Sequence, residues 1–255
     1  LFVLILETIG AMLIFFAVGE NFDSSSEQVF FSIFHAVSAF CNAGFSTLSN
    51  SLFEESFRDN YSFHMIIAFI IIFGGLGYGV IINLKQYLSK YFFYFVNHNF
   101  GLKWKGHTEK FRPYLSLNSK IVIYTTVILI ILGFLAFLVL EMDNTLKDHK
   151  GFGQLVTAFF GSVTTRTAGF NTVDTGSLNL STLVIVLFLM WIGASPGSTG
   201  GGIKTTTFAV ATLNVIQQVF GYNNISIGYK KIPQTALQRA TAIISLSLIM
   251  IGIST

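Results

Sequence analysis

A short glycine-containing loop occurs twice in this chain, each time between apolar segments. The copies read CNAGFST at residues 41–47 and RTAGFNT at residues 166–172, so both contain Ala-Gly-Phe-x-Thr. Each copy follows a short amphipathic run, residues 28–41 or 154–166, and precedes a long apolar run. In a bilayer, irregular backbone is tolerated only where it is buried in protein or lines a water-filled path. We therefore expect two half-helices that enter the membrane and turn back at these loops, lining a path for ions.

The composition independently favours a membrane protein. Hydrophobic residues make up 52% of the chain and charged residues 11%, with a mean hydropathy of +0.66, whereas about a quarter of an ordinary soluble domain is charged. Three segments approach the roughly 20 apolar residues that cross a bilayer, namely residues 1–19, 63–84 and 121–140. We expect the first to be a spanning helix rather than a signal peptide, because no basic leader precedes it.

A further apolar region is interrupted by a glycine-rich segment. Residues 183–194 are too few to span alone, and the sequence SPGSTGGGIKTTT separates them from a second apolar stretch at residues 208–220. This pattern predicts a broken helix. Residues 240–255 are apolar again, so we expect the natural chain to continue beyond them.

Charged residues predict the orientation in the membrane. The loop at residues 85–120 carries one acid, Glu109, against seven basic residues: Lys85, Lys90, Lys103, Lys105, Lys110, Arg112 and Lys120. The charged residues of the segment 20–60 are acidic except for Arg58. The turn with Lys230, Lys231 and Arg239 is basic again. Because cytoplasmic loops are enriched in Lys and Arg, the 85–120 loop should be cytoplasmic. Both glycine loops should then enter from the outside, as a parallel repeat.

The glycine loops have the features of a cation filter. Gly44 and Gly169 can adopt the positive φ that a strand needs to aim successive carbonyls at one axis. The C-terminal end of each half-helix, with its partial negative charge, favours a cation. No charged side chain lies in the first loop, so potassium is the natural candidate, with sodium as a second ion. The candidate filter residues are Asn42, Ala43, Gly44, Phe45, Thr167, Ala168, Gly169 and Phe170. A pair of turns that merely pack is the alternative.

Three motifs carry a family resemblance. NAGFST, TTRTAGFNTVD and GASPGSTGGGIKTTT resemble the second and third pore loops and the intramembrane gate of the Trk/Ktr/HKT superfamily of potassium transporters, and the resemblance runs along all 255 residues. The spelling is most similar to the membrane subunit of the bacterial Ktr system. The resemblance implies an all-α membrane protein of the cell membrane, with repeated helix-pore loop-helix units around a central ion pore. It also implies a homodimer in membrane lipid and a cytoplasmic RCK-type nucleotide-binding ring as regulatory partner.

The family pattern divides the chain into four parts. Residues 1–84 match the second unit, 85–120 the basic cytoplasmic loop, 121–221 the third unit with its broken second helix, and 222–255 the start of a further unit. The family has four units in one subunit, and this chain departs from it by holding only two complete ones. The first and fourth filter strands are absent, which implies a fragment that cannot conduct alone.

The resemblance also gives the glycine-rich break a role as a flexible gate below the filter. Its candidate residues are Gly197, Ser198, Thr199, Gly200, Gly201, Gly202 and Lys204. We expect Lys204 in or near the pore, with snorkelling to the inner interface as the alternative. A phosphate-binding loop is the rival interpretation, but Ile203 stands between Gly202 and Lys204 and breaks that motif.

The remaining candidates are structural. Arg166 should brace the pore loops by donating to carbonyls, or else pair with Asp174. We expect His35 to be packed and neutral rather than a metal ligand. Four glycines, Gly74, Gly75, Gly77 and Gly79, should allow close helix contact, with a hinge as the alternative. Cys41 is the one cysteine, which rules out an intrachain disulfide and makes structural zinc implausible.

The predicted function is potassium transport across the plasma membrane, driven by the membrane potential, with sodium either permeating or acting as a coupling ion. The alternative is a secondary transporter with a substrate site at the broken helix. The sequence holds no paired acids, nucleophile or metal cluster of the kind an enzyme needs, and no nucleic-acid partner is expected.

Overall fold

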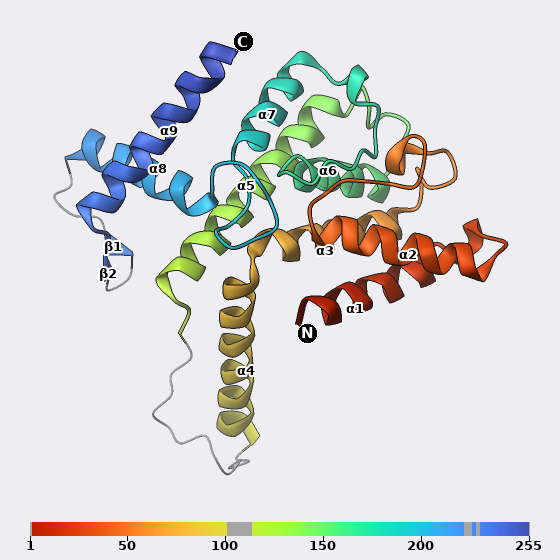
Figure 1. The fold of residues 1–255 in the computed structure, drawn as a ribbon, viewed down its shortest axis with the longest axis horizontal. Helices are drawn as coiled ribbons and strands as arrows, with labels where there is room; N and C mark the ends of the chain where they lie inside the picture. Colours follow the sequence, from red (N-terminus) through yellow and green to blue (C-terminus); the bar gives the residue numbers. More distant parts are fainter. Residues whose placement is uncertain (1, 101–113, 222–225, 228–229, 255) are drawn as a thin grey trace.

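A computed structural model describes residues 2–100, 114–221, 226–227 and 230–254. Most of these residues are helical (Figure 1). The helices are α1 (Phe2–Ala17), α2 (Ser25–Phe40), α3 (Tyr61–Leu76), α4 (Tyr78–Phe100), α5 (Leu117–Glu141), α6 (Phe152–Thr164), α7 (Leu180–Trp191), α8 (Thr205–Phe220) and α9 (Gln234–Ser254). Two antiparallel strands of two residues each, β1 (Ser226–Ile227) and β2 (Lys230–Lys231), lie between α8 and α9. They are a small departure from the predicted all-α fold in the described part of the chain.

The same order of elements occurs twice. In the first half α1 packs on α2 and α3, and in the second α5 packs on α6 and α7. The short helices α2 and α6 each end at a glycine loop: the first Gly loop, residues 41–47, and the second Gly loop, residues 166–172. Contacts between α3 and α6 join the two halves, and α8 lies against both α5 and α9 (Figure 1).

Two of the described helices, α5 and α9, are long and apolar enough to cross a membrane, and the count rises to three if the bent pair α3 and α4 forms one span. The segment 121–140 thus lies within a continuous helix, as predicted. The helix predicted at residues 1–19 has 16 residues in α1, fewer than a full span.

The segment 63–84, predicted to span the membrane, is not one continuous helix. Helix α3 ends at Leu76, and α4 starts at Tyr78 after a bend of 103°. Gly77, between them, has a φ of +77°, a backbone conformation that costs a residue with a Cβ but not glycine. Helix α4 therefore leaves the body of the molecule in its own direction (Figure 1).

The interrupted helix is present, with slightly different bounds. Helix α7 ends at Trp191 and α8 begins at Thr205, three residues earlier than the predicted second half. Residues 192–204 between them are called the α7–α8 loop below.

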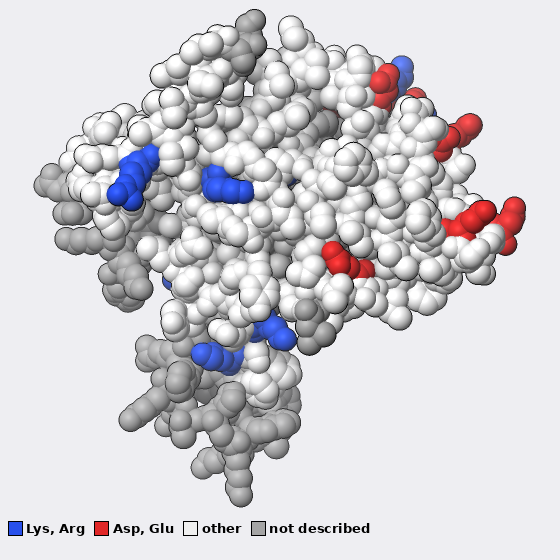
Figure 2. Space-filling view, in the orientation of Figure 1, with Lys and Arg blue, Asp and Glu red and all other residues white. Residues whose placement is uncertain are grey.

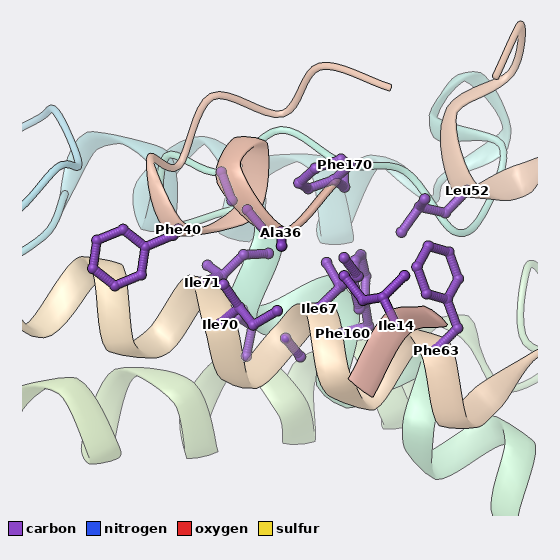
Figure 3. Packing of buried hydrophobic residues seen from close by; sticks show 14 of the residues in the cluster. Ile14, Ala36, Phe40, Leu52, Phe63, Ile67, Ile70, Ile71, Phe160 and Phe170 are labelled. Atoms are coloured by element: carbon purple, nitrogen blue, oxygen red, sulfur yellow. The ribbon is translucent and has the colours of Figure 1, made fainter. Parts of the chain in front are cut away.

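The main hydrophobic core lies directly behind the Gly loops. Phe63 and Ile67 of α3, Phe160 of α6 and Phe170 of the second Gly loop are fully buried in one cluster (Figure 3). Many large apolar side chains of α1, α5, α7 and α9 are instead exposed on the outside of the molecule. An apolar exterior of this extent suits a protein whose solvent is lipid.

Charged side chains gather at opposite ends of the visible face. In Figure 2 acidic side chains lie mainly toward the right, where the loops around α2 and α3 are found, and basic side chains toward the left and the bottom. Four basic residues of the predicted cytoplasmic loop, Lys103, Lys105, Lys110 and Arg112, lie outside the described residues.

Candidate functional site

The two Gly loops share an unusual backbone. In the first, Asn42 has a φ of +50° and Gly44 a φ of +71°. In the second, the corresponding Thr167 and Gly169 have φ values of +70° and +92°. The positive φ predicted at both glycines is confirmed. Asn42 and Thr167 were predicted as filter residues, but their positive φ was not, because non-glycine residues seldom adopt this conformation and it costs them free energy. The same uncommon backbone conformation is thus repeated at matched positions of the two loops.

The Gly loops lie against each other. A Cβ atom on Gly44 would overlap the carbonyl oxygen of Ala168 and would stand 2.9 Å from the Cα of Gly169. A Cβ on Gly169 would have its nearest neighbour, the Cα of Gly44, at 3.7 Å. Gly44 is therefore required both by its φ and by the space available, whereas Gly169 is required by its φ alone.

Each half-helix holds the carbonyl of the loop phenylalanine through a hydroxyl group. Ser38 Oγ of α2 donates to the Phe45 carbonyl at 2.7 Å, and Thr164 Oγ1 of α6 donates to the Phe170 carbonyl at 2.7 Å. The environments of the two rings differ, since Phe45 is 70% exposed and Phe170 is fully buried. The C-terminal ends of α2 and α6 both meet the Gly loops, so the partial negative charge of each helix end favours a cation there.

Hydrogen bonds within the α7–α8 loop join its two ends. The amide of Gly193 donates to the Ile203 carbonyl at 2.9 Å, and the amide of Ile203 donates to the Trp191 carbonyl at 3.1 Å. Lys204 Nζ donates to the Gly200 carbonyl at 2.7 Å. The ammonium group predicted in or near a pore is thus bound to the loop's own backbone.

The α7–α8 loop also lies close to both Gly loops, near the residues that follow α2 and α6. A Cβ on Gly200 would lie 2.7 Å from Thr167 Oγ1 and 3.1 Å from the side-chain amide of Asn42. Glycine is the residue that allows this approach. The α7–α8 loop therefore lies directly against both Gly loops.

Arg166 links the second Gly loop to the α7–α8 loop. Its guanidinium is buried, and Nη2 donates to the Gly193 carbonyl at 3.2 Å. The Asp174 carboxylate instead accepts from the amide of Gly176 at 2.9 Å. Of the two predicted contacts the structure favours a carbonyl, although this carbonyl belongs to the α7–α8 loop.

His35 of α2 is buried and packed within the protein, as expected. Its Nδ1 lies 2.9 Å from the Phe31 carbonyl and its Nε2 lies 2.9 Å from Ser46 Oγ, so the ring ties the half-helix to the end of the first Gly loop. Within the described ranges no three His, Cys, Asp or Glu residues form a group that could hold a metal ion.

Comparisons with known proteins identify the family of this chain. The model of the TrkH family, described as cation transport proteins, matches residues 1–253. The chain is 32% identical to the potassium/sodium uptake protein NtpJ of Enterococcus hirae, over 99% of this chain and 51% of that protein. It is 32% identical to the Ktr system potassium uptake protein B of Bacillus subtilis, over 99% of this chain and 52% of the relative. The chain thus spans about half the length of these relatives.

A solved structure is also similar. The potassium transporter TrkH from Vibrio parahaemolyticus superposes with a TM-score of 0.63 at 20% sequence identity, over 92% of this chain and 45% of that one. At this identity the match bears on the fold alone. Together with the family match over nearly every residue, it shows that this chain is a multi-pass membrane protein and belongs to the TrkH family of cation transport proteins.

Proposed function

We propose that this chain supplies two of the filter strands and the gate of a potassium pathway through the cell membrane. The observation that carries the proposal is the matched pair of Gly loops. Each follows a half-helix, and each has a positive φ at the glycine and at the residue two positions before it. Carbonyl oxygens of residues 42–45 and 167–170 would replace the hydration shell of the ion. The α7–α8 loop, in contact with both strands, acts as the gate.

The names of the relatives support the choice of ion. One relative is called a potassium uptake protein and another a potassium/sodium uptake protein. We take potassium as the main ion, with sodium either permeating or coupled. A membrane potential of about 100 mV is worth roughly 2.3 kcal/mol per charge, enough for accumulation on the order of 50-fold.

The proposed assembly follows the division of the chain into residues 1–84, 85–120, 121–221 and 222–255. The complete protein would be a homodimer in lipid, with a nucleotide-binding ring of the RCK type on its cytoplasmic side. The relative named for a Ktr "system" supports a partner subunit. Helix α4, with Lys85 and exposed Tyr91 and Phe92, offers a surface for that partner or for lipid headgroups.

Substituting the two loop glycines tests the filter. In the full-length protein, Gly44→Ser and Gly169→Ser should lower potassium affinity and the preference for potassium over sodium, because serine resists a positive φ. Gly44→Ser should be the more severe, since its side chain also meets the Ala168 carbonyl. Gly79→Ser is the matched control, because a Cβ there has no atom within 4 Å. Wild-type ion preference in both loop variants would show that these loops are not the filter.

Deleting residues 198–204 distinguishes a gate from a carrier site. Removal of a gate should raise ion flux, most visibly without the regulatory partner. A carrier whose broken helix binds the substrate should instead lose transport, because the unwound backbone would supply its ligands. Flux must be normalised to folded protein in the membrane. A folded deletion variant that transports less than wild type would favour the carrier.

A further inference from the structure

Helix α3 ends inside the protein, where its last carbonyl groups need partners. The final four carbonyls of any helix have no donor within the helix. In a bilayer no bulk water is available to bind them, and each unsatisfied group is costly. The final carbonyls of α3 belong to Phe73, Gly74, Gly75 and Leu76.

The α7–α8 loop supplies donors to three of them. The amide of Ser195 donates to the Gly75 carbonyl at 3.0 Å, and Ser195 Oγ donates to the Leu76 carbonyl. The amide of Thr199 donates to the Gly74 carbonyl at 3.5 Å. Ser195 itself is fully buried. The candidate gate is therefore fastened to the break in a helix more than a hundred residues earlier in the chain.

Thr199 adds a second fastening, to a half-helix. Its Oγ1 donates at 2.9 Å to the carbonyl of Phe40, the last residue of α2. A Cβ on Gly74 would overlap this same carbonyl and stand 3.1 Å from Thr199 Oγ1. Gly74 thus leaves the space that lets Thr199, α2 and α3 meet at one point.

The fastening lies at the bend from which α4 projects. A Cβ on Gly77 would stand 2.9 Å from Ser195 Oγ and 3.0 Å from the Gly197 carbonyl. On its other side, the Gly77 carbonyl accepts from the amide of Ile81 in the first turn of α4. Gly77 thus lies between the α7–α8 loop and the first turn of α4, so a rotation of α4 about Gly77 would disturb the contacts of Gly77 with Ser195 and Gly197.

We propose that Ser195 and Thr199 are positioning residues that hold the gate closed against the α3–α4 break, and that α4 is the lever through which a cytoplasmic partner releases it. The inference rests on the gate function proposed above. Hydrogen bonds inside the loop, such as Lys204 Nζ to the Gly200 carbonyl, do not involve α3. Once the hydrogen bonds from Ser195 and Thr199 to α2 and α3 break, the α7–α8 loop can move as one unit. Water that enters the open path then binds the carbonyls that have lost these donors.

Removing the two hydroxyls tests the fastening. In the full-length protein without its regulatory partner, Ser195→Ala and Thr199→Val should each raise potassium flux roughly 2- to 10-fold, the effect of losing one net hydrogen bond from the closed state. Potassium over sodium preference should stay at the wild-type value. Thr212→Val is the matched control, because its hydroxyl donates to the Phe208 carbonyl within α8. Its flux should equal that of wild type.

Cysteine labelling reports the loop position without relying on flux. Gly201→Cys, in a Cys41→Ser background, places a thiol at an exposed loop position where a Cβ has open space. Thr199→Val should increase its labelling rate. In the Ser195→Ala, Thr199→Val double variant, the regulatory partner should no longer change flux. A partner effect as large as in wild type would overturn the lever.

The deletion of residues 198–204 separates failure of this inference from failure of the gate. If the deletion raises flux while Ser195→Ala and Thr199→Val leave both flux and labelling unchanged, the gate stands and the fastening is wrong. If the deletion lowers flux in folded protein, the gate itself is wrong. Within the deletion background Ser195→Ala should have no further effect, and an additional rise there would contradict a shared role.

Discussion

Arg166 and Lys204 are basic side chains within the apolar body, and each binds a backbone carbonyl. Arg166 donates to Gly193 and Lys204 to Gly200, so both charges contact the α7–α8 loop. An ionisable group at membrane depth is costly unless it is paired or faces water. In the proposed function, a positive charge near the path would also oppose a cation. Movement of the α7–α8 loop would shift Lys204 and break the contact between Gly193 and Arg166, which lies on the second Gly loop.

His149 gives the predicted outer side a pH-dependent contact. The side chain is 1% exposed, and Nδ1 lies 2.9 Å from the Tyr61 hydroxyl and 3.6 Å from the Asp59 carboxylate. Its Nε2 is buried without a hydrogen-bond partner among the described residues. Burial, and then the charge of Arg58, lower the pKa of His149 below its usual 6.5, in spite of Asp59.

Acidification should therefore destabilise this contact. In the unfolded state His149 takes up a proton at its usual pKa of 6.5, and in the folded state only at a lower pH. The stabilisation of the fold is therefore present above pH 6.5 and is lost as pH falls through the folded pKa. We expect the melting temperature of the purified protein to fall over this window, and His149→Gln to make the slope shallower. An unchanged slope in the variant would show that another group controls it.

At the scale of elements, the half-helices were predicted directly, whereas the α3–α4 break corresponds only to the alternative of a hinge among the glycines of residues 74–79. Helices α2 and α6 are formed by the amphipathic runs that end at a glycine loop. This pattern is local and can be recognised directly in the sequence. The break at Gly77 lies in an apolar run, and hydropathy reports transfer into lipid rather than the direction of the backbone. The α7–α8 loop supplies partners at this break, since Ser195 donates to the end of α3. Such a long-range partner cannot be recognised from the local pattern.

Helices α5 and α7 are joined by one buried carboxylate, that of Glu141. Oε1 accepts from the Asn179 amide at 2.9 Å and from Thr182 Oγ1 at 2.5 Å, while Oε2 accepts from Asn144 Nδ2 at 2.8 Å. The charge also lies at the N-terminus of α7, where the helix dipole favours an anion. A neutral amide would turn an N–H toward donors that now bind an oxygen.

Glu141→Gln should therefore lower stability by about 1–3 kcal/mol, the cost of leaving buried donors unsatisfied. The expected result is a lower melting temperature with unchanged ion preference, since Glu141 is not among the Gly-loop residues. Asp143→Asn, two positions away and exposed, is the control for the loss of charge alone. Equal melting temperatures for the two variants would contradict the structural role of the carboxylate.

At the scale of the whole molecule, the separation of charge predicts how the chain lies in the membrane. Acidic residues of the loops around α2 and α3 lie toward one end, and the basic residues of α4 lie toward another (Figure 2). Because Lys and Arg are retained on the cytoplasmic side, both Gly loops should open outward.

Thiol labelling of intact cells tests this orientation. In a Cys41→Ser background of the full-length protein, Glu55→Cys between α2 and α3 and Thr175→Cys between α6 and α7 should react with a membrane-impermeant reagent added outside. Gln86→Cys on α4 should react only after the membrane is permeabilised. All three positions are exposed, so burial does not limit the reaction. Labelling of Glu55→Cys and Thr175→Cys from opposite sides would mean an inverted repeat, and the two Gly loops could not then form strands of one filter that opens outward.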